Sequence, residues 1–295
     1  MGKTFKFKTC NPAVRGKTVK NKSCMTPEVV EEIKNKFNKH NPENKIQASK
    51  PTEVWEELKN KFNTCKSELC WLNSIKDPVM KAKIKRKLFP PDRPNEWKDD
   101  PNTWLSNEDI LNVLNQYEDA YKCFKFIGPT PIDYDYKESS FLGNDKCVTE
   151  ELCKFILDEM IKKKYSKIGI IFNLDKHSGP GTHWVSLFVN VKEKFIFYFD
   201  SNGVPPNRQI VKMINKIKDD GKSLKKPIIF QTIINKFQHQ QSDTECGMYS
   251  LYFIITLLTE KINNKKVNIG KIKHHFLKKR VEDELVFKLR YKYFI

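Results

Sequence analysis

The sequence has no apolar run long enough to cross a membrane. The longest candidate, Met248–Leu258, falls well short of the roughly 20 apolar residues that a spanning helix needs, and it contains Tyr, Ser and Thr. We therefore expect a protein without a membrane span.

Cysteine pairs of the kind that hold zinc are also missing. Eight cysteines are present, but none forms a C-x-x-C pair, and the spacings Cys65-x4-Cys70 and Cys147-x5-Cys153 lack the pairing of a zinc site. We expect no metal and no other cofactor. The simplest interpretation of the cysteines is free thiols in a reducing compartment.

Acidic residues are few relative to basic ones. Lys and Arg number 54 against 36 Asp and Glu, which gives a formal net charge of +18, and residues 1–27 contain seven basic residues and no acid. Such a charge favours contact with polyanions, nucleic acid first. Two readings stay open: a DNA contact through the basic surface, or surface lysine that serves solubility in a chain rich in Lys, Asn and Ile.

The order of helical and strand-like patterns divides the chain into two regions. Helix-like segments occupy the chain up to about residue 90, and the polar, Pro-rich stretch PPDRPNEWKDDPN is the best linker candidate. Beyond it, amphipathic segments mix with β-branched and aromatic runs such as SKIGIIFNL, THWVSLFVNV and KFIFYFDS. We expect residues 1–90 to form a basic, mostly helical extension and residues 91–295 an α+β domain with a central mixed β-sheet flanked by helices.

Two helices of the second region have recognisable features. Ser106 and Asp109 make the S-x-x-D pattern of a capping box before an amphipathic segment. The basic stretch IGKIKHHFLKKRVEDELVFKLR, residues 269–290, predicts a helix near the C-terminus.

A single cysteine stands where a polar loop turns into an apolar helix, within HQQSDTECGMYSLYF at 239–253. Free backbone N–H groups and the helix dipole favour a thiolate at such a position, so Cys246 is a candidate nucleophile. Gly247 behind it is expected to let a substrate backbone approach closely. Asp243 and Glu245 would be solvated loop residues, although a carboxylate there tends to raise the thiol pKa unless it is screened.

A thiol nucleophile needs a base, and His183 is the best of six histidines. It opens an apolar strand directly before Trp184, whereas four of the others lie in polar or loop-like stretches. His239 is nearer to the cysteine in sequence, but it lies at the end of a strand among glutamines. A strand end is a rigid platform for a base.

An imidazole base needs an orienting partner, and Asp200 ends the next strand. If residues 183–191 and 194–201 pair as an antiparallel hairpin, His183 and Asp200 fall at the same end. Asn202, two residues further on, is a rival for this role.

Acyl transfer also requires donors for the developing oxyanion. The side-chain amide of Gln240 or of Gln241 could supply one, with the backbone N–H of Cys246 as the second.

These residues together carry a resemblance to a known family. The order HW at 183–184, FDS at 199–201 and Gln240-x5-Cys246-Gly247 resembles the adenain/ubiquitin-like-protein protease superfamily over roughly residues 100–290. The glutamine lies six residues before the cysteine in the cellular members, which selects Gln240. WLSNEDI at 104–110 is similar to the segment that opens the substrate channel in those enzymes.

The resemblance implies a papain-like or Ulp-like cysteine protease core. The catalytic residues would be His183, Asp200, Cys246 and Gln240. The substrate-binding residues would be Trp184, Trp104, Gly247 and Asn202.

Within the superfamily the chain looks most like the virion-maturation proteases of large nucleocytoplasmic DNA viruses, to judge from GPTPIDYD at 128–135, the basic extension and the Lys/Asn bias. This implies cleavage of viral core or capsid precursor polyproteins beside Gly-Gly-type sites, in the virion core and the host cytoplasm. The main alternative is an isopeptidase that removes ubiquitin-like modifiers. A non-enzymatic basic binding protein and an acetyltransferase on the same fold are more remote.

Overall fold

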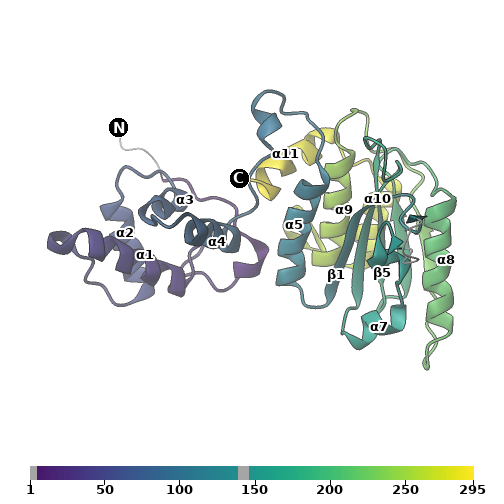
Figure 1. Cartoon of the computed structure of the whole chain (residues 1–295), viewed down its shortest axis with the longest axis horizontal. Coiled ribbons are helices and arrows are strands. Elements are labelled where there is room, and N and C mark those ends of the chain that lie inside the picture. Colours follow the sequence, from purple (N-terminus) through teal and green to yellow (C-terminus); the bar gives the residue numbers. More distant parts are fainter. Residues whose placement is uncertain (1–4, 139–145) are drawn as a thin grey trace. The chain divides into compact units, whose positions relative to one another are not determined.

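The computed structural model describes residues 5–138 and 146–295, which form two compact units (Figure 1). The first unit contains the chain up to Arg93 together with Tyr291–Ile295, and the second contains Pro94–Arg290. Helices make up the first unit and a mixed sheet with flanking helices makes up the second, so the prediction of an α+β fold with a helical N-terminal region is confirmed.

The first unit is held together by an aromatic core. The side chains of Trp55 and Trp71 are fully buried, with their ring centroids 5.4 Å apart, and both pack among the apolar faces of the surrounding helices. Such rings bury a large apolar area each and account for much of the packing of a small unit. The helices are α1 (Pro27–His40), α2 (Pro51–Lys61), α3 (Glu68–Trp71) and α4 (Pro78–Leu88).

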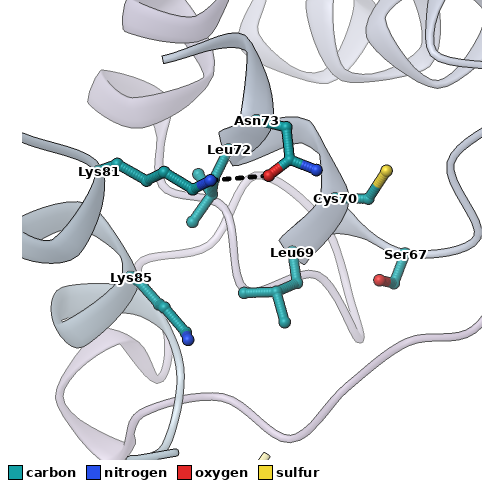
Figure 2. A pocket seen from close by; sticks show the side chains of 7 residues that line it. All are labelled: Ser67, Leu69, Cys70, Leu72, Asn73, Lys81 and Lys85. Atoms are coloured by element: carbon teal, nitrogen blue, oxygen red, sulfur yellow. Dashed lines mark hydrogen bonds between the residues drawn. The ribbon is translucent and has the colours of Figure 1, made fainter. Parts of the chain in front are cut away.

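A pocket opens in this unit between the segment around α3 and one face of α4 (Figure 2). Lys81 and Lys85 lie one turn apart on α4, and the Lys81 Nζ donates a hydrogen bond to Asn73 Oδ1 at 2.8 Å. The lining residues are Ser67, Leu69, Cys70, Leu72, Asn73, Lys81 and Lys85.

The second unit is built on a five-stranded sheet in the order β1-β4-β5-β6-β7. The central pairs β4–β5 and β5–β6 are antiparallel, whereas the outer pairs β1–β4 and β6–β7 are parallel. The strands are β1 (Phe124–Pro131), β4 (Lys167–Asn173), β5 (Trp184–Asn190), β6 (Phe195–Phe199) and β7 (Gln231–Ile234).

The side chains of β6 alternate between the two faces of the sheet and are apolar on both, so helices cover both faces. Phe197 and Phe199 point to one face, where each ring packs on Phe253 of α9 (Cys246–Thr259). Ile196 and Tyr198 point to the other face and join the core that includes α8 (Arg208–Lys222). Figure 1 shows α9 and α5 (Asn107–Ala120) on one side of the sheet and α8 on the other. Because both faces are covered, the strands read as continuous apolar runs.

The remaining elements of the second unit are short or lie at its periphery. They are the strands β2 (Lys137–Glu138), β3 (Lys146–Cys147), β8 (Lys261–Ile262) and β9 (Lys265–Lys266), and the helices α6 (Glu150–Cys153), α7 (Leu157–Lys162), α10 (Ile269–Lys278) and α11 (Asp283–Tyr293).

The predicted C-terminal helix over 269–290 is two helices. The chain leaves the helical path between α10 and α11, where the Val281 N–H donates to a ring nitrogen of His239 and the Arg280 Nε donates to the His239 carbonyl. The Val281 N–H thus bonds to a distant loop instead of to a carbonyl of the preceding turn, and no local sequence pattern indicates this contact.

The expectation of free thiols throughout is wrong for six of the eight cysteines. The structure pairs Cys10 with Cys24, Cys65 with Cys70 and Cys147 with Cys153 in disulfides. In each pair the local course of the chain brings the Cα atoms within 6.3 Å. Cys123 and Cys246 carry free thiols. Among the cysteines, only these two free thiols therefore still support the prediction of a reducing compartment.

No helix in the described ranges, 5–138 and 146–295, combines the length and the apolar character that crossing a bilayer requires. Within the same ranges, His, Cys, Asp and Glu side chains nowhere gather in a group of three or more suited to a metal ion.

Candidate active site

The antiparallel pairing of β5 with β6 places two polar residues at one end of the sheet. Ser186 lies opposite Phe199, so His183, just before β5, and Asp200, just after β6, leave the sheet side by side. His183 Nε2 and Asp200 Oδ1 are 2.7 Å apart. Because Nε2 is occupied by the carboxylate, the opposite ring nitrogen, Nδ1, is left to face another partner.

That partner is Cys246, the first residue of α9. The helix is apolar on all sides and packs against β5, which brings its N-terminus, with the buried thiol, to the His183 end of the strand. Burial lowers the pKa of His183, but hydrogen bonds to Asp200 and Cys246 and the negative charges of both outweigh it and raise the pKa from 6.5 to about 9. The site therefore favours a protonated imidazole at neutral pH, placed against the side chain of Cys246.

The Asp200 carboxylate, rather than Asn202, makes the orienting contact. Asn202 is exposed, and its backbone N–H donates to the same Asp200 Oδ1 at 2.8 Å. Asp200 is 1% exposed, and its other oxygen, Oδ2, is buried without a hydrogen-bond partner among the described residues. This leaves the aspartate one strong charged contact, which is the contact to the imidazole.

The backbone of Asp200 is fixed by Asn235, which follows β7. Asn235 Oδ1 accepts from the Asp200 N–H at 2.9 Å, and its Nδ2 donates to the Asp200 and Phe237 carbonyls at 3.0 and 2.9 Å. Asn235 is fully buried. Sequence reasoning did not single it out, although an amide at the end of an apolar strand was a signal that could have done so.

Gln240 lies in the loop that leads to Cys246, with its amide held at both ends. Its Oε1 accepts from Ser201 Oγ at 2.7 Å, and its Nε2 donates to the Ser242 carbonyl. The Ser201 hydroxyl therefore fixes which end of the amide carries the N–H groups, and it turns them toward the loop before the cysteine. The side chain of the rival, Gln241, is exposed, and its backbone N–H donates to Asp283.

Gly247 lies where the protein leaves little room for a side chain. A Cβ at this position would lie 3.2 Å from Leu105 Cβ and 3.2 Å from Trp184 Cδ1. The glycine therefore permits close packing of Leu105 and Trp184 at the start of α9, and its role in substrate approach stays a prediction.

The segment 103–105 is pinned beside the start of α9. Trp184 is 4% exposed, and its Nε1 donates to the Leu105 carbonyl at 3.2 Å. Trp104 lies next to this anchor with 41% of its surface exposed, so its ring is available to an incoming chain. The predicted capping box follows at once, with the Asp109 N–H donating to Ser106 Oγ and the Ser106 N–H to Asp109 Oδ2.

His239 is part of the core. Its Nε2 donates to the Phe276 carbonyl at 2.9 Å, and its Nδ1 accepts from the Val281 N–H at 3.0 Å. Burial lowers the pKa of His239, and the charge of Arg280 lowers it further, so the ring is neutral. With both nitrogens engaged, it has no free atom with which to act as a base.

A thiol at a helix start, an imidazole beside it and a buried carboxylate behind the imidazole form the arrangement of a thiol hydrolase. Residues 99–288, well over half of the chain, match the model of the Ulp1 protease family, C-terminal catalytic domain. The chain belongs to this family of cysteine proteases.

Two viral relatives are similar to the chain. A protein of Acanthamoeba polyphaga mimivirus, named as a thiol protease, is 35% identical over 157 residues, which are 53% of this chain and 48% of that protein. A cysteine protease of African swine fever virus is 26% identical over 190 residues, 63% of this chain and 66% of that protein, and in another isolate it is named SUMO-1 cysteine protease. The chain thus spans about half the length of the first relative and just under two thirds of the second.

A solved structure of an African swine fever virus protease, determined by crystallography, has the same fold. The TM-score is 0.63 at 20% identity, with 99% of this chain and 97% of that chain covered.

Proposed function

We propose that the chain is a cysteine endopeptidase with Cys246 as nucleophile, His183 as general base and acid, and Asp200 as the orienting group. The observation that carries the proposal is the hydrogen-bonded series from Cys246 through His183 to Asp200 at one end of the sheet. An imidazole held at both nitrogens can move a proton between the thiol and the leaving group without reorienting.

The reaction follows from this series. The Cys246 thiolate attacks the peptide carbonyl and forms a C–S bond, while Gln240 Nε2 and the Cys246 N–H receive the oxyanion. His183 gives its proton to the leaving nitrogen as the C–N bond breaks. The neutral imidazole then takes a proton from water, which attacks the thioester and releases the acid product and the thiol.

We expect the enzyme to cut after small residues, in Gly-Gly-X-type sites. The support is that Trp184 and Leu105 pack beside Gly247, next to the nucleophile, and that the exposed Trp104 directly precedes Leu105 in the chain. Two indole rings beside a cleavage site leave little room for side chains at the residues just before the scissile bond.

Cleavage of a Gly-Gly-X peptide tests the activity. Cys246→Ala and Cys246→Ser should abolish turnover, whereas Cys123→Ser, which removes the other free thiol, should leave it unchanged. Full activity in the Cys246→Ala variant would end the proposal.

The substrates that we propose are precursor polyproteins of a viral core or capsid, processed in the virion core and the host cytoplasm. The support is the viral origin of the relatives named as proteases. Mass-spectrometric mapping of new N-termini on purified precursors, with the Cys246→Ala protein as control, should place cuts after Gly-Gly. Cuts unrelated to that motif would contradict the assignment.

An isopeptidase acting on ubiquitin-like modifiers is the second candidate, favoured by the SUMO-1 protease name of one relative. A modifier carrying a C-terminal electrophile should label Cys246 if this function is correct. Labelling faster than cleavage of the precursor peptide would make it the main activity.

DNA is a proposed partner of the first unit. Residues 1–93 contain 22 Lys and Arg against 10 Asp and Glu, so this part of the chain holds most of the net charge. Lys83 and Lys87 are exposed on α4, whose Lys81 and Lys85 line the pocket of Figure 2. Replacing Lys83 and Lys87 by Glu should weaken DNA binding and flatten its salt dependence, whereas the same change at exposed Lys225 and Lys226 should not. If both pairs of lysine substitutions weaken DNA binding equally, the binding would depend on net charge alone and not on the α4 surface.

A further inference from the structure

Glu245, the residue directly before the nucleophile, is not a solvated loop residue. It is 2% exposed and paired with Arg290 of α11, which is also 2% exposed. The Arg290 Nη2 lies 2.7 Å from Glu245 Oε1, and its Nε lies 3.2 Å from both carboxylate oxygens.

The same guanidinium contacts the segment that carries Trp104. The Arg290 Nη1 donates to the Thr103 carbonyl at 3.0 Å, and the guanidinium stacks over the Trp97 ring at 4.4 Å. The Trp97 Nε1 donates to that same Thr103 carbonyl at 3.0 Å. Thus one side chain from the end of α11 links the residue before Cys246 to the residue before Trp104.

An isolated carboxylate beside a thiol works against catalysis. It repels the thiolate and so raises the pKa of the nucleophile, more strongly where water is excluded. Burial raises the pKa of the Glu245 carboxyl, and the hydrogen bond and charge of Arg290 act in the opposite direction. A buried ion pair adds little net stability compared with apolar packing. We therefore look for the effect of the Glu245–Arg290 pair on the neighbouring thiol and not on the stability of the fold.

We propose that Arg290 is a positioning residue of the active site, which cancels the charge of Glu245 beside the nucleophile and holds the Trp104 segment against it. The expected effect of Arg290 on turnover rests on the proposed function. The effect of Arg290 on the Cys246 thiol can be measured without a substrate. The other titratable groups that act on this pair are Asp283 of α11 and Tyr249 of α9, which are bonded to each other, with Arg280 on the aspartate. The Thr244 hydroxyl also donates to Glu245 Oε1, at 3.5 Å.

The test is the rate of Cys246 alkylation by iodoacetamide as a function of pH, in a Cys123→Ser background so that the other free thiol does not react. Arg290→Gln leaves the carboxylate alone and should move the midpoint up by about half a pH unit or more. Glu245→Gln leaves the cation alone and should move it down. The double variant should return close to the parent value.

Opposite shifts separate this role from mere support of the fold, which would move both single variants in the same direction. Arg290→Lys keeps the charge but loses the planar fork, so it should restore the midpoint while kcat/KM on the peptide stays reduced. Lys288→Gln removes a cation from the exposed side of α11 and should change neither quantity.

Shifts in one direction only, or none in the folded variants, would overturn the proposal. If Arg290→Gln does not fold, Glu245→Gln and Arg290→Lys still decide, since a rise of the midpoint in Glu245→Gln would contradict it. Loss of the proposed function would show instead as Cys246-independent cleavage, with the alkylation results unaffected.

Discussion

Asn235 holds Asp200 by its backbone from both sides, accepting from its N–H and donating to its carbonyl. The amide acts as a strand partner where β7 has already ended, and so it fixes the direction in which the Asp200 carboxylate leaves β6.

Asn235→Ala should therefore impair catalysis through Asp200. Removing a buried side chain that makes three hydrogen bonds should cost about 1–3 kcal/mol of stability and lower kcat more than it changes KM. Chemical unfolding and peptide turnover check both effects. Gln231→Ala, on the exposed side of the same strand, is the control, and a kcat equal to that of the control would contradict the role.

The pH dependence of turnover should reflect His183. Its pKa of about 9 predicts that kcat/KM falls on the basic side near pH 9, where the imidazolium loses its proton. Because the folded pKa lies above the ordinary value of 6.5, protonation also stabilises the fold. That contribution is complete below about pH 6.5 and is lost as the pH rises through about 9.

Asp200→Asn separates charge from geometry at this histidine. An asparagine can still accept the Nε2 hydrogen bond, but it lacks the negative charge that helps to raise the His183 pKa. We expect an active enzyme whose basic limb moves down by about one pH unit, whereas Asp200→Ala should lose most activity. An unshifted profile in Asp200→Asn would show that the charge is irrelevant.

Gln240→Ala should lower kcat by about 10²–10³, the typical cost of one oxyanion donor. Ser201→Ala should have a smaller effect of the same kind, because it frees the amide to rotate. Gln241→Ala, whose side chain is exposed, is the matched control, and an equal loss there would reverse the assignment of the two glutamines.

Gly247→Ala should be destabilising because the added methyl meets Leu105 and Trp184. We expect a loss of about 1–3 kcal/mol in the free energy of unfolding. Gly270→Ala in α10 has room for its methyl and should be neutral or slightly stabilising. Equal stability of the two variants would show that the start of α9 can move aside.

The part of the site that could be predicted from sequence is the part built by local chain geometry. His183 and Asp200 are joined by one hairpin, and Cys246 marks a change from polar loop to apolar helix, so short-range patterns were sufficient. Their expected roles as nucleophile, base and orienting group follow from the chemistry of the residues at these positions, and the family resemblance implies the same roles.

The residues that were missed depend on long-range pairing. Asn235 reaches Asp200 only because β7 pairs in parallel with β6 after the α8 crossover, and Arg290 reaches Glu245 from a helix 45 residues further along the chain. The interruption at Arg280 and Val281 has the same origin, since the ring of the distant His239 takes the backbone N–H of Val281 that a helix would have used. Neither the periodicity of apolar residues nor the spacing of motifs in the sequence indicates which distant residues will be in contact.

The membership of Tyr291–Ile295 in the first unit has a topological consequence. The Ile295 N–H donates to the Pro91 carbonyl, and the Arg93 N–H donates to the Ile295 carbonyl. Ile295 is therefore hydrogen-bonded to two residues of the segment in which the chain leaves the first unit. The protease domain is thus an insertion within the polypeptide of the first unit, which the chain leaves after Arg93 and re-enters at Tyr291. A cut at the Pro-rich linker alone would not yield two separate proteins, and a tag or deletion at the C-terminus would act first on the basic unit that lies at the other end of the sequence.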